Sequence, residues 1–186
     1  DDECSLRQLK ALIQKYNRII IVAPGKSING LNKEIFSDSN ICVFSVNFTY
    51  NFAADSFVFL TNTKRLHNIE KNPENIIITS NLLNENIDTN LVINRNNLIY
   101  HKEYRCEDST LMLINLLYRI GVNAIEIAGF DGFIDGQDNF YRTDYEHILR
   151  DKSYSTENIR QILTEVYDGI RIKFLTPSIY EYGENK

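Results

Sequence analysis

The sequence predicts an α/β fold, a three-layer Rossmann-like domain with a mostly parallel, doubly wound sheet. Short apolar runs rich in β-branched residues recur along the chain, and helical segments lie between many of them. Most of these runs are continuous rather than alternating, which is typical of strands covered on both faces in a parallel sheet. Strands that alternate with helices in this way indicate a doubly wound sheet.

The runs expected to be strands are 18–23, 41–46, 56–60, 75–80, 90–93, 124–129 and 171–175. Helices are expected over 6–16, 109–120 and 156–168. The middle helix is apolar on most faces, with Asp108 or Ser109 as its cap and Gly121 as its stop. The last helix places Ile159, Ile162, Leu163 and Val166 on one stripe, which predicts a buried face.

Composition places the chain among ordinary globular domains. Its 186 residues are 43% hydrophobic, and we expect one domain over 1–186. The net charge of −5 argues against a general nucleic-acid binder. No apolar run approaches the roughly 20 residues that span a bilayer, so we expect no membrane span and a cytoplasmic location.

Two further features of the chain concern its cellular context. Its three cysteines lie far apart and Cys42 falls in an apolar run, so we expect buried thiols rather than a disulfide framework. The sequence begins without methionine, which suggests a domain excised from a longer protein, although a removed initiator or tag would look the same.

Small polar residues follow most of the expected strands. Ligands of doubly wound folds bind beyond the carboxyl ends of the strands, near the point where strand order reverses. The segments at those ends are 24–27, 47–49, 61–63, 80–81 and 129–132, and Asn, Ser, Thr and Gly dominate them. Such a rim suits hydrogen bonding to a sugar, a base or a phosphate.

The Gly25-Lys26-Ser27 run looks like the tail of a P-loop, but Ile20 stands where that motif needs its first glycine. The NTPase interpretation therefore fails on spacing. Exposed N–H groups, the Ser27 hydroxyl and the Lys26 charge can still hold an anion together. A plain strand-to-helix turn explains the same residues.

Two other segments allow a ligand and a purely structural interpretation. Ser109 and Thr110 begin the apolar helix, whose N-terminus can face a phosphate, yet capping alone explains these residue types. Gly129 lets the backbone approach a ligand while Asp131 accepts from a hydroxyl, yet a bare turn needs no ligand.

No metal site is expected from the sequence. Asp131, Asp135 and Asp138 lack the EF-hand spacing, and His67, His101 and His147 are scattered without ligand spacing. The polar segment 135–155 is either a lid whose Tyr141 and His147 serve acid–base chemistry or a solvated loop.

Taken in order, these motifs resemble the nucleotide-binding core of small bacterial sialyltransferases and the glycosyltransferase-like domains of motility accessory proteins. A Gly-Pro-Ser loop of that group corresponds to Gly25-Lys26-Ser27, and strand-end asparagines correspond to Asn47 and Asn62. A Ser-Gly helix start corresponds to Ser109-Thr110, and the stretch IGVNAIEIAGFD leads to Asp131. Thr176-Pro177-Ser178 matches a late strand end. The resemblance implies a nucleotide-sugar ligand and no metal cofactor.

A closer likeness is to the region behind the catalytic domain of bacterial HMG-CoA-lyase-like aldolases. The pieces PGKSI, SxNF (SVNF here), TSN and AGFDG recur there together, followed by an echo of Asn139-Phe140-Tyr141. This likeness implies an N-terminal aldolase (lyase) module in the parent chain, with a possible homo-oligomer.

The chain departs from the sialyltransferase pattern at the catalytic base. The lid histidine of that group falls near Lys152 here, about five residues from His147, and Pro24 replaces an Asn. We therefore expect a nucleotide or nucleotide-sugar binding domain, accessory to the aldolase, in carbohydrate or surface-polysaccharide metabolism. An active metal-independent glycosyltransferase and a ligand-free interaction domain remain alternatives.

Overall fold

The computed structural model describes residues 2–50, 54–69, 75–100, 106–134, 139–142 and 156–181. Within these residues, parallel strands form one seven-stranded sheet in the order β5-β4-β3-β2-β1-β6-β7. The strands are β1 (Arg18–Val22), β2 (Ile41–Val46), β3 (Asp55–Leu60), β4 (Ile76–Thr79), β5 (Leu91–Ile93), β6 (Ala124–Ala128) and β7 (Arg171–Phe174). The predicted Rossmann-like α/β class is confirmed.

Both faces of the central strands are buried, which explains their continuous apolar runs. Ile19 and Ile21 of β1 join the core beneath the α-helices, and their neighbours Ile20 and Val22 join a second core on the opposite face. Side chains alternate between faces along a strand, so a strand covered on both sides needs apolar residues at every position.

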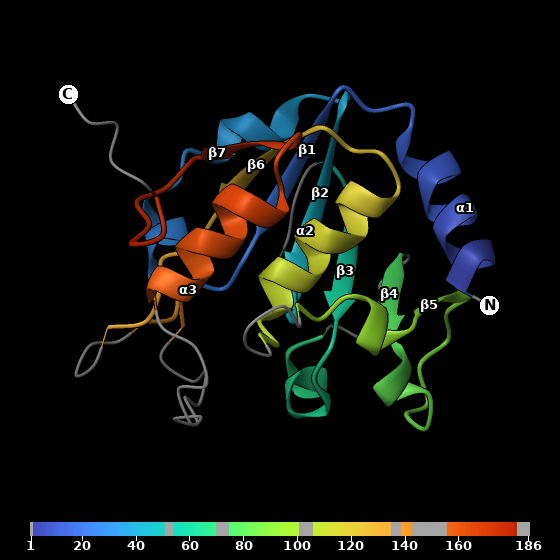
Figure 1. Ribbon diagram of the computed structural model, residues 1–186. Coiled ribbons are helices and arrows are strands. Elements are labelled where there is room, and N and C mark those ends of the chain that lie inside the picture. Colours follow the sequence, from blue (N-terminus) through green and yellow to red (C-terminus); the bar gives the residue numbers. More distant parts are fainter. Residues whose placement is uncertain are drawn as a thin grey trace.

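Three α-helices cover the first face: α1 (Asp2–Ile13), α2 (Ser109–Arg119) and α3 (Thr156–Gln161). α2 and α3 lie across the sheet in Figure 1, and α1 packs beside β5. Tyr167, which is buried in the segment that follows α3, donates its hydroxyl hydrogen to the Leu111 carbonyl at 3.0 Å. This hydrogen bond joins that segment to α2. α3 is shorter than expected because it continues as a π-helical turn, η6 (Ile162–Val166).

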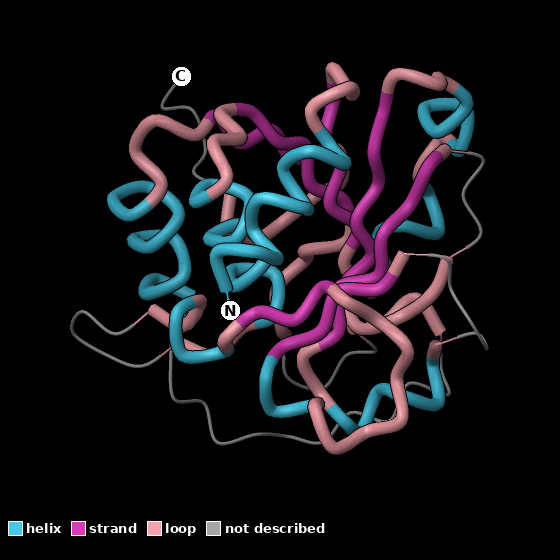
Figure 2. Tube along the Cα trace, turned by 90° about the vertical axis from the view of Figure 1, so that its right-hand side faces the viewer, coloured by secondary structure: helices cyan, strands magenta, loops and turns pink. Residues whose placement is uncertain are grey.

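The opposite face is covered by two 3-10 helices, η1 (Lys26–Gly30) and η2 (Lys33–Ser37), whose Ile28 and Phe36 are buried against β1 and β2. Further 3-10 turns follow β3, β4 and β5: η3 (Thr63–Asn68), η4 (Ser80–Leu82) and η5 (Arg95–Asn97). Figure 2 shows the α-helices on one side of the twisted strands.

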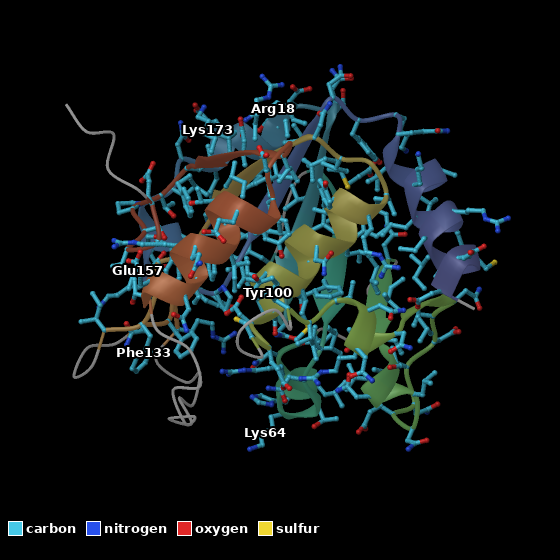
Figure 3. The ribbon with its side chains drawn as sticks, in the orientation of Figure 1. Arg18, Lys64, Tyr100, Phe133, Glu157 and Lys173 are labelled. Atoms are coloured by element: carbon cyan, nitrogen blue, oxygen red, sulfur yellow. The ribbon has the colours of Figure 1, made fainter. Side chains whose placement is uncertain are left out.

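The strand order reverses between β1 and β6, because β1 pairs with β2 on one side and with β6 on the other. This is the switch point beside which doubly wound folds bind ligands. Figure 3 orients the sheet: Arg18, the first residue of β1, lies at one edge, and Lys64 of η3 lies at the carboxyl edge.

Helix α1 starts at Asp2 rather than at position 6, and it ends at Ile13 rather than at Tyr16. The Tyr16 hydroxyl instead bonds the Asp55 carboxylate at the start of β3. None of the helices in the described ranges is long and apolar enough to cross a membrane.

Candidate ligand-binding edge of the sheet

A network of polar side chains joins the ends of β2 and β3 to the start of α2. The Asn47 amide donates to the Ser109 hydroxyl at 2.9 Å, and its carbonyl oxygen accepts from the Thr61 N–H at 2.8 Å. The hydroxyls of Thr61 and Ser109 lie 2.7 Å apart. We call these three residues the Asn47 network. It forms because β2 and β3 are neighbours and α2 lies over their carboxyl ends.

Asn47 holds its place in the network with an unusual backbone. Its φ of 62° lies in the left-handed region, and among the described residues it is the one non-glycine there. Asn tolerates this region better than most residues. Its own N–H donates to the Phe59 carbonyl at 2.9 Å, so the strained conformation is fixed from both backbone and side chain.

The network has two hydrogen arrangements. If Ser109 donates to Thr61, the Thr61 hydroxyl is left to donate to the Asn47 carbonyl across a long 3.3 Å contact. If Thr61 donates to Ser109, the Ser109 hydrogen is released for another acceptor. A ligand oxygen beside the half-buried Ser109 can therefore gain a donor at the loss of one long hydrogen bond.

Asn81 extends the network toward β4. Its amide donates to the Thr61 carbonyl at 3.0 Å, and its carbonyl oxygen accepts from the Thr79 hydroxyl at 2.7 Å. Thr61 was not singled out as a ligand residue in the sequence, although its position directly after β3 was the available signal. Asn62, which was singled out, instead caps η3 by accepting from the Lys64 N–H at 3.0 Å.

The N-terminal cap of α2 is Asp108 rather than Ser109, the other residue that the sequence offered for this role. One carboxylate oxygen accepts from the N–H groups of Thr110 and Leu111 at 2.8 and 3.0 Å. Burial of the carboxyl group raises its pKa, and the two N–H donors act in the opposite direction. Thr110 is buried with its N–H used by this cap, so the helix start does not present that N–H to a phosphate.

The loops after β1 and β6 close on each other at the switch point. Asp131 accepts from the Ser27 N–H at 2.8 Å and from the Ser27 hydroxyl. The Gly25 N–H donates to the Gly129 carbonyl at 2.9 Å, and the Lys26 N–H donates to the Asn139 carbonyl at 3.3 Å. The expectation of exposed N–H groups in this loop is wrong for this conformation, because all three donate to protein acceptors.

The small residues of these loops serve the same closure. A Cβ on Gly25 would lie 2.2 Å from the Gly129 carbonyl oxygen, and one on Gly129 would lie 2.0 Å from the Ala23 carbonyl oxygen. Because each glycine lacks a Cβ, a backbone carbonyl group from another segment can pack directly against it. A ligand role for Gly25, Lys26, Ser27, Gly129 and Asp131 stays a prediction, and an anion bound to the Ser27 N–H would have to displace the Asp131 carboxylate.

The predicted residues thus lie at one edge of the sheet in two groups. In the first group, Asn47 and Ser109 contact each other directly. In the second group, Ser27, which follows β1, contacts Asp131, which follows β6. Because β1 and β2 are paired, the two groups follow adjacent strands. Of the acid–base candidates, Tyr141 packs against Phe48 with ring centroids 5.1 Å apart. His147 lies outside the described residues, as do His101, Asp135 and Asp138.

Two features of the described residues bear on the site. Among them, no group of three or more His, Cys, Asp or Glu side chains is placed to hold a metal ion. An open hollow of about 460 Å³ lies at the amino edge, lined by Asn123, Tyr167 and Arg171 among others, and so lies away from the Asn47 network.

Comparison with known proteins found no match: no family model, no curated protein and no solved structure matches this chain. The resemblance to sialyltransferase-like domains and to the aldolase-associated region therefore remains a hypothesis that rests on the quoted motifs.

Proposed function

We propose that this domain binds a nucleotide or a nucleotide-sugar at the carboxyl edge of its sheet. The observation that carries the proposal is the contact of Asn47 with Ser109 and Thr61. It gathers uncharged donors and acceptors from three separate elements at the carboxyl edge of the sheet, where ligands of this fold class bind, one strand away from the switch point. A left-handed Asn in such a position is a form of backbone strain that occurs at functional sites.

The chemistry of the network suits the sugar or phosphate oxygens of such a ligand. When Thr61 donates to Ser109, the Ser109 hydroxyl hydrogen is free to donate to a sugar or phosphate oxygen. The Asp131 carboxylate at the end of β6 disfavours a second anion in the Gly25-Lys26-Ser27 loop. We therefore assign first ligand contact to the Asn47 network.

Isothermal titration calorimetry with CMP, UDP, GDP and their sugar conjugates tests the proposal. We expect at least one of them to bind, and Ser109→Ala to weaken it about tenfold, the loss of one or two hydrogen bonds. Asn47→Gly keeps the left-handed backbone while removing the amide, and it should weaken binding similarly. Ser39→Ala is the matched control, since Ser39 is exposed before β2, at the opposite edge.

The outcomes separate the three functional classes. Binding without turnover supports an accessory role, which by motif resemblance would serve an aldolase module. Hydrolysis of a bound nucleotide-sugar that disappears in His147→Ala would support a glycosyltransferase instead. Absence of binding to every nucleotide and nucleotide-sugar, with no thermal shift, would reject the proposal and leave an interaction domain.

A further inference from the structure

Aromatic rings gather on the other side of the loop that holds Asn47. Tyr50 and Tyr141 lie with ring centroids 6.2 Å apart, and both pack on the fully buried Phe48, at 6.1 and 5.1 Å. Tyr50, Phe140 and Tyr141 are half-buried, so part of each ring is accessible. We call these three residues the aromatic patch. The Asn47 side chain turns toward α2, whereas the patch packs against the core of the opposite face.

The backbone that carries two of these rings is fixed to the loop after β1. The Tyr141 N–H donates to the Pro24 carbonyl and the Asn29 amide donates to the Tyr141 carbonyl, both at 3.1 Å. Phe140 forms an antiparallel bridge with Gly25. A platform held this way loses little conformational entropy when a ligand binds, which favours affinity.

Two cations lie over rings of the patch. The Lys33 ammonium lies 5.4 Å from the Tyr50 ring centroid, and the Arg65 guanidinium lies 5.4 Å from that of Phe140. The contact with Phe140 orients Arg65, whose planar fork suits a phosphate. Lys64 adjoins it on η3 at the carboxyl edge (Figure 3).

We propose that the aromatic patch is the nucleobase and phosphate subsite of the carboxyl edge, with the base stacked on Tyr141 and a phosphate paired with Arg65. This inference rests on the proposed function and names the part of the nucleotide that each group recognises. Stacking accepts any base because every base has a π-face. The Asn47 network, across the same loop, then faces the sugar end of the ligand.

The test uses nucleoside monophosphates, the matching nucleosides and ribose 5-phosphate as probes of the whole chain. We expect nucleotides to bind at least about tenfold more tightly than ribose 5-phosphate, which lacks the base. The chain contains no tryptophan, so etheno-AMP fluorescence can be excited separately and should be quenched by stacking on Tyr141.

Variants assign the two contacts. Tyr141→Leu keeps apolar bulk over Phe48 but removes the π-face, and should weaken nucleotide binding about tenfold, whereas Tyr141→Phe should keep it. Arg65→Gln should weaken nucleotide binding and leave nucleoside binding unchanged. Tyr118→Leu is the matched control, since Tyr118 is 44% exposed on α2 and outside the patch.

The failures of the two proposals are distinguishable. If nucleotides bind and Ser109→Ala weakens them while Tyr141→Leu and Arg65→Gln do not, the subsite is overturned and the proposed function stands. If nothing binds, both fail. If single-stranded oligonucleotides bind far more tightly than mononucleotides, with steep salt dependence, the patch is a nucleic-acid surface and the subsite is overturned.

Discussion

Asp131 accepts hydrogen bonds from both the backbone N–H and the hydroxyl of Ser27, a residue 104 positions earlier in the chain. Hydrogen bonds to a charged group are stronger than neutral ones, and these two join the loops after β1 and β6. The carboxylate thus receives the donors that a phosphate would use in this loop.

Replacing Asp131 should therefore cost stability. We expect Asp131→Ala to lower the free energy of unfolding by about 1.5–3 kcal/mol, because it removes a charged acceptor from two donors. Urea denaturation measures the change. Asp88→Ala, which truncates an exposed aspartate, should stay within about 0.5 kcal/mol of the parent chain. Equal midpoints for the two variants would show that the Ser27–Asp131 contact contributes nothing to folding.

Gly129 and Gly30 offer a matched pair of glycine substitutions. Gly129 has φ +71° and its added Cβ would lie 2.0 Å from the Ala23 carbonyl oxygen, so Gly129→Ala should destabilise the fold by about 2–5 kcal/mol. Gly30 has ordinary φ and nothing within 4 Å of an added Cβ. Gly30→Ala should be neutral or stabilise by up to about 1 kcal/mol. Thermal unfolding compares both with the parent, and similar losses for the two would contradict the close loop contact.

The strands could be predicted closely because a strand buried on both faces has apolar residues at consecutive positions. The run 41–46 is β2 with every residue buried, and the run 56–60 differs from β3 only at Asp55. Helix ends follow less directly from the sequence. The expected last helix changes to π-helical hydrogen bonding after Gln161. The residues of that stretch contain no sequence signal that would predict this change.

The sequence predicted which residues lie at the candidate site, but it did not predict which of them contact each other. Asn47 and Ser109 were picked out because one follows a strand and the other begins a helix, and they do meet. That Ser27 would pair with Asp131 depends on which loops the switch point brings together, and this is set by strand order. Small polar residues looked the same whether they were to bind a ligand or each other.

The three cysteines should differ sharply in reactivity. Burial raises the pKa of the Cys42 and Cys106 thiols to about 12, whereas Cys4 is exposed on α1. A thiol with that pKa is about one ten-thousandth ionised at pH 8, and only the thiolate reacts quickly. We expect a thiol reagent to modify Cys4 alone in the native protein and all three cysteines in urea. Cys4→Ser should abolish the native reaction, and rapid modification of that variant would contradict the buried core.

Asp108 gives the fold a pH dependence of defined sign. Because burial raises its pKa in the folded protein above the ordinary value of 3.8, the unfolded chain loses the proton first as pH rises. The folded state then holds more protons than the unfolded state, so stability falls between the ordinary and the raised pKa and stays lower above both. Asp108→Asn removes the ionisation and keeps a good cap. Its free energy of unfolding should equal the parent's below pH 3.8, exceed it increasingly between pH 3.8 and the raised pKa, and exceed it by a constant amount above both.

Asp108→Ala separates the cap from the charge. It lacks both the ionisation and the acceptor for the Thr110 and Leu111 N–H groups, so it should unfold about 1 kcal/mol more easily than Asp108→Asn at every pH. Urea titrations of the three proteins from pH 3 to pH 8 measure the differences. If the parent gains stability relative to Asp108→Asn as pH rises, the ionised carboxylate is favoured in the fold, because its attraction to the α2 N-terminus then outweighs its loss of solvation.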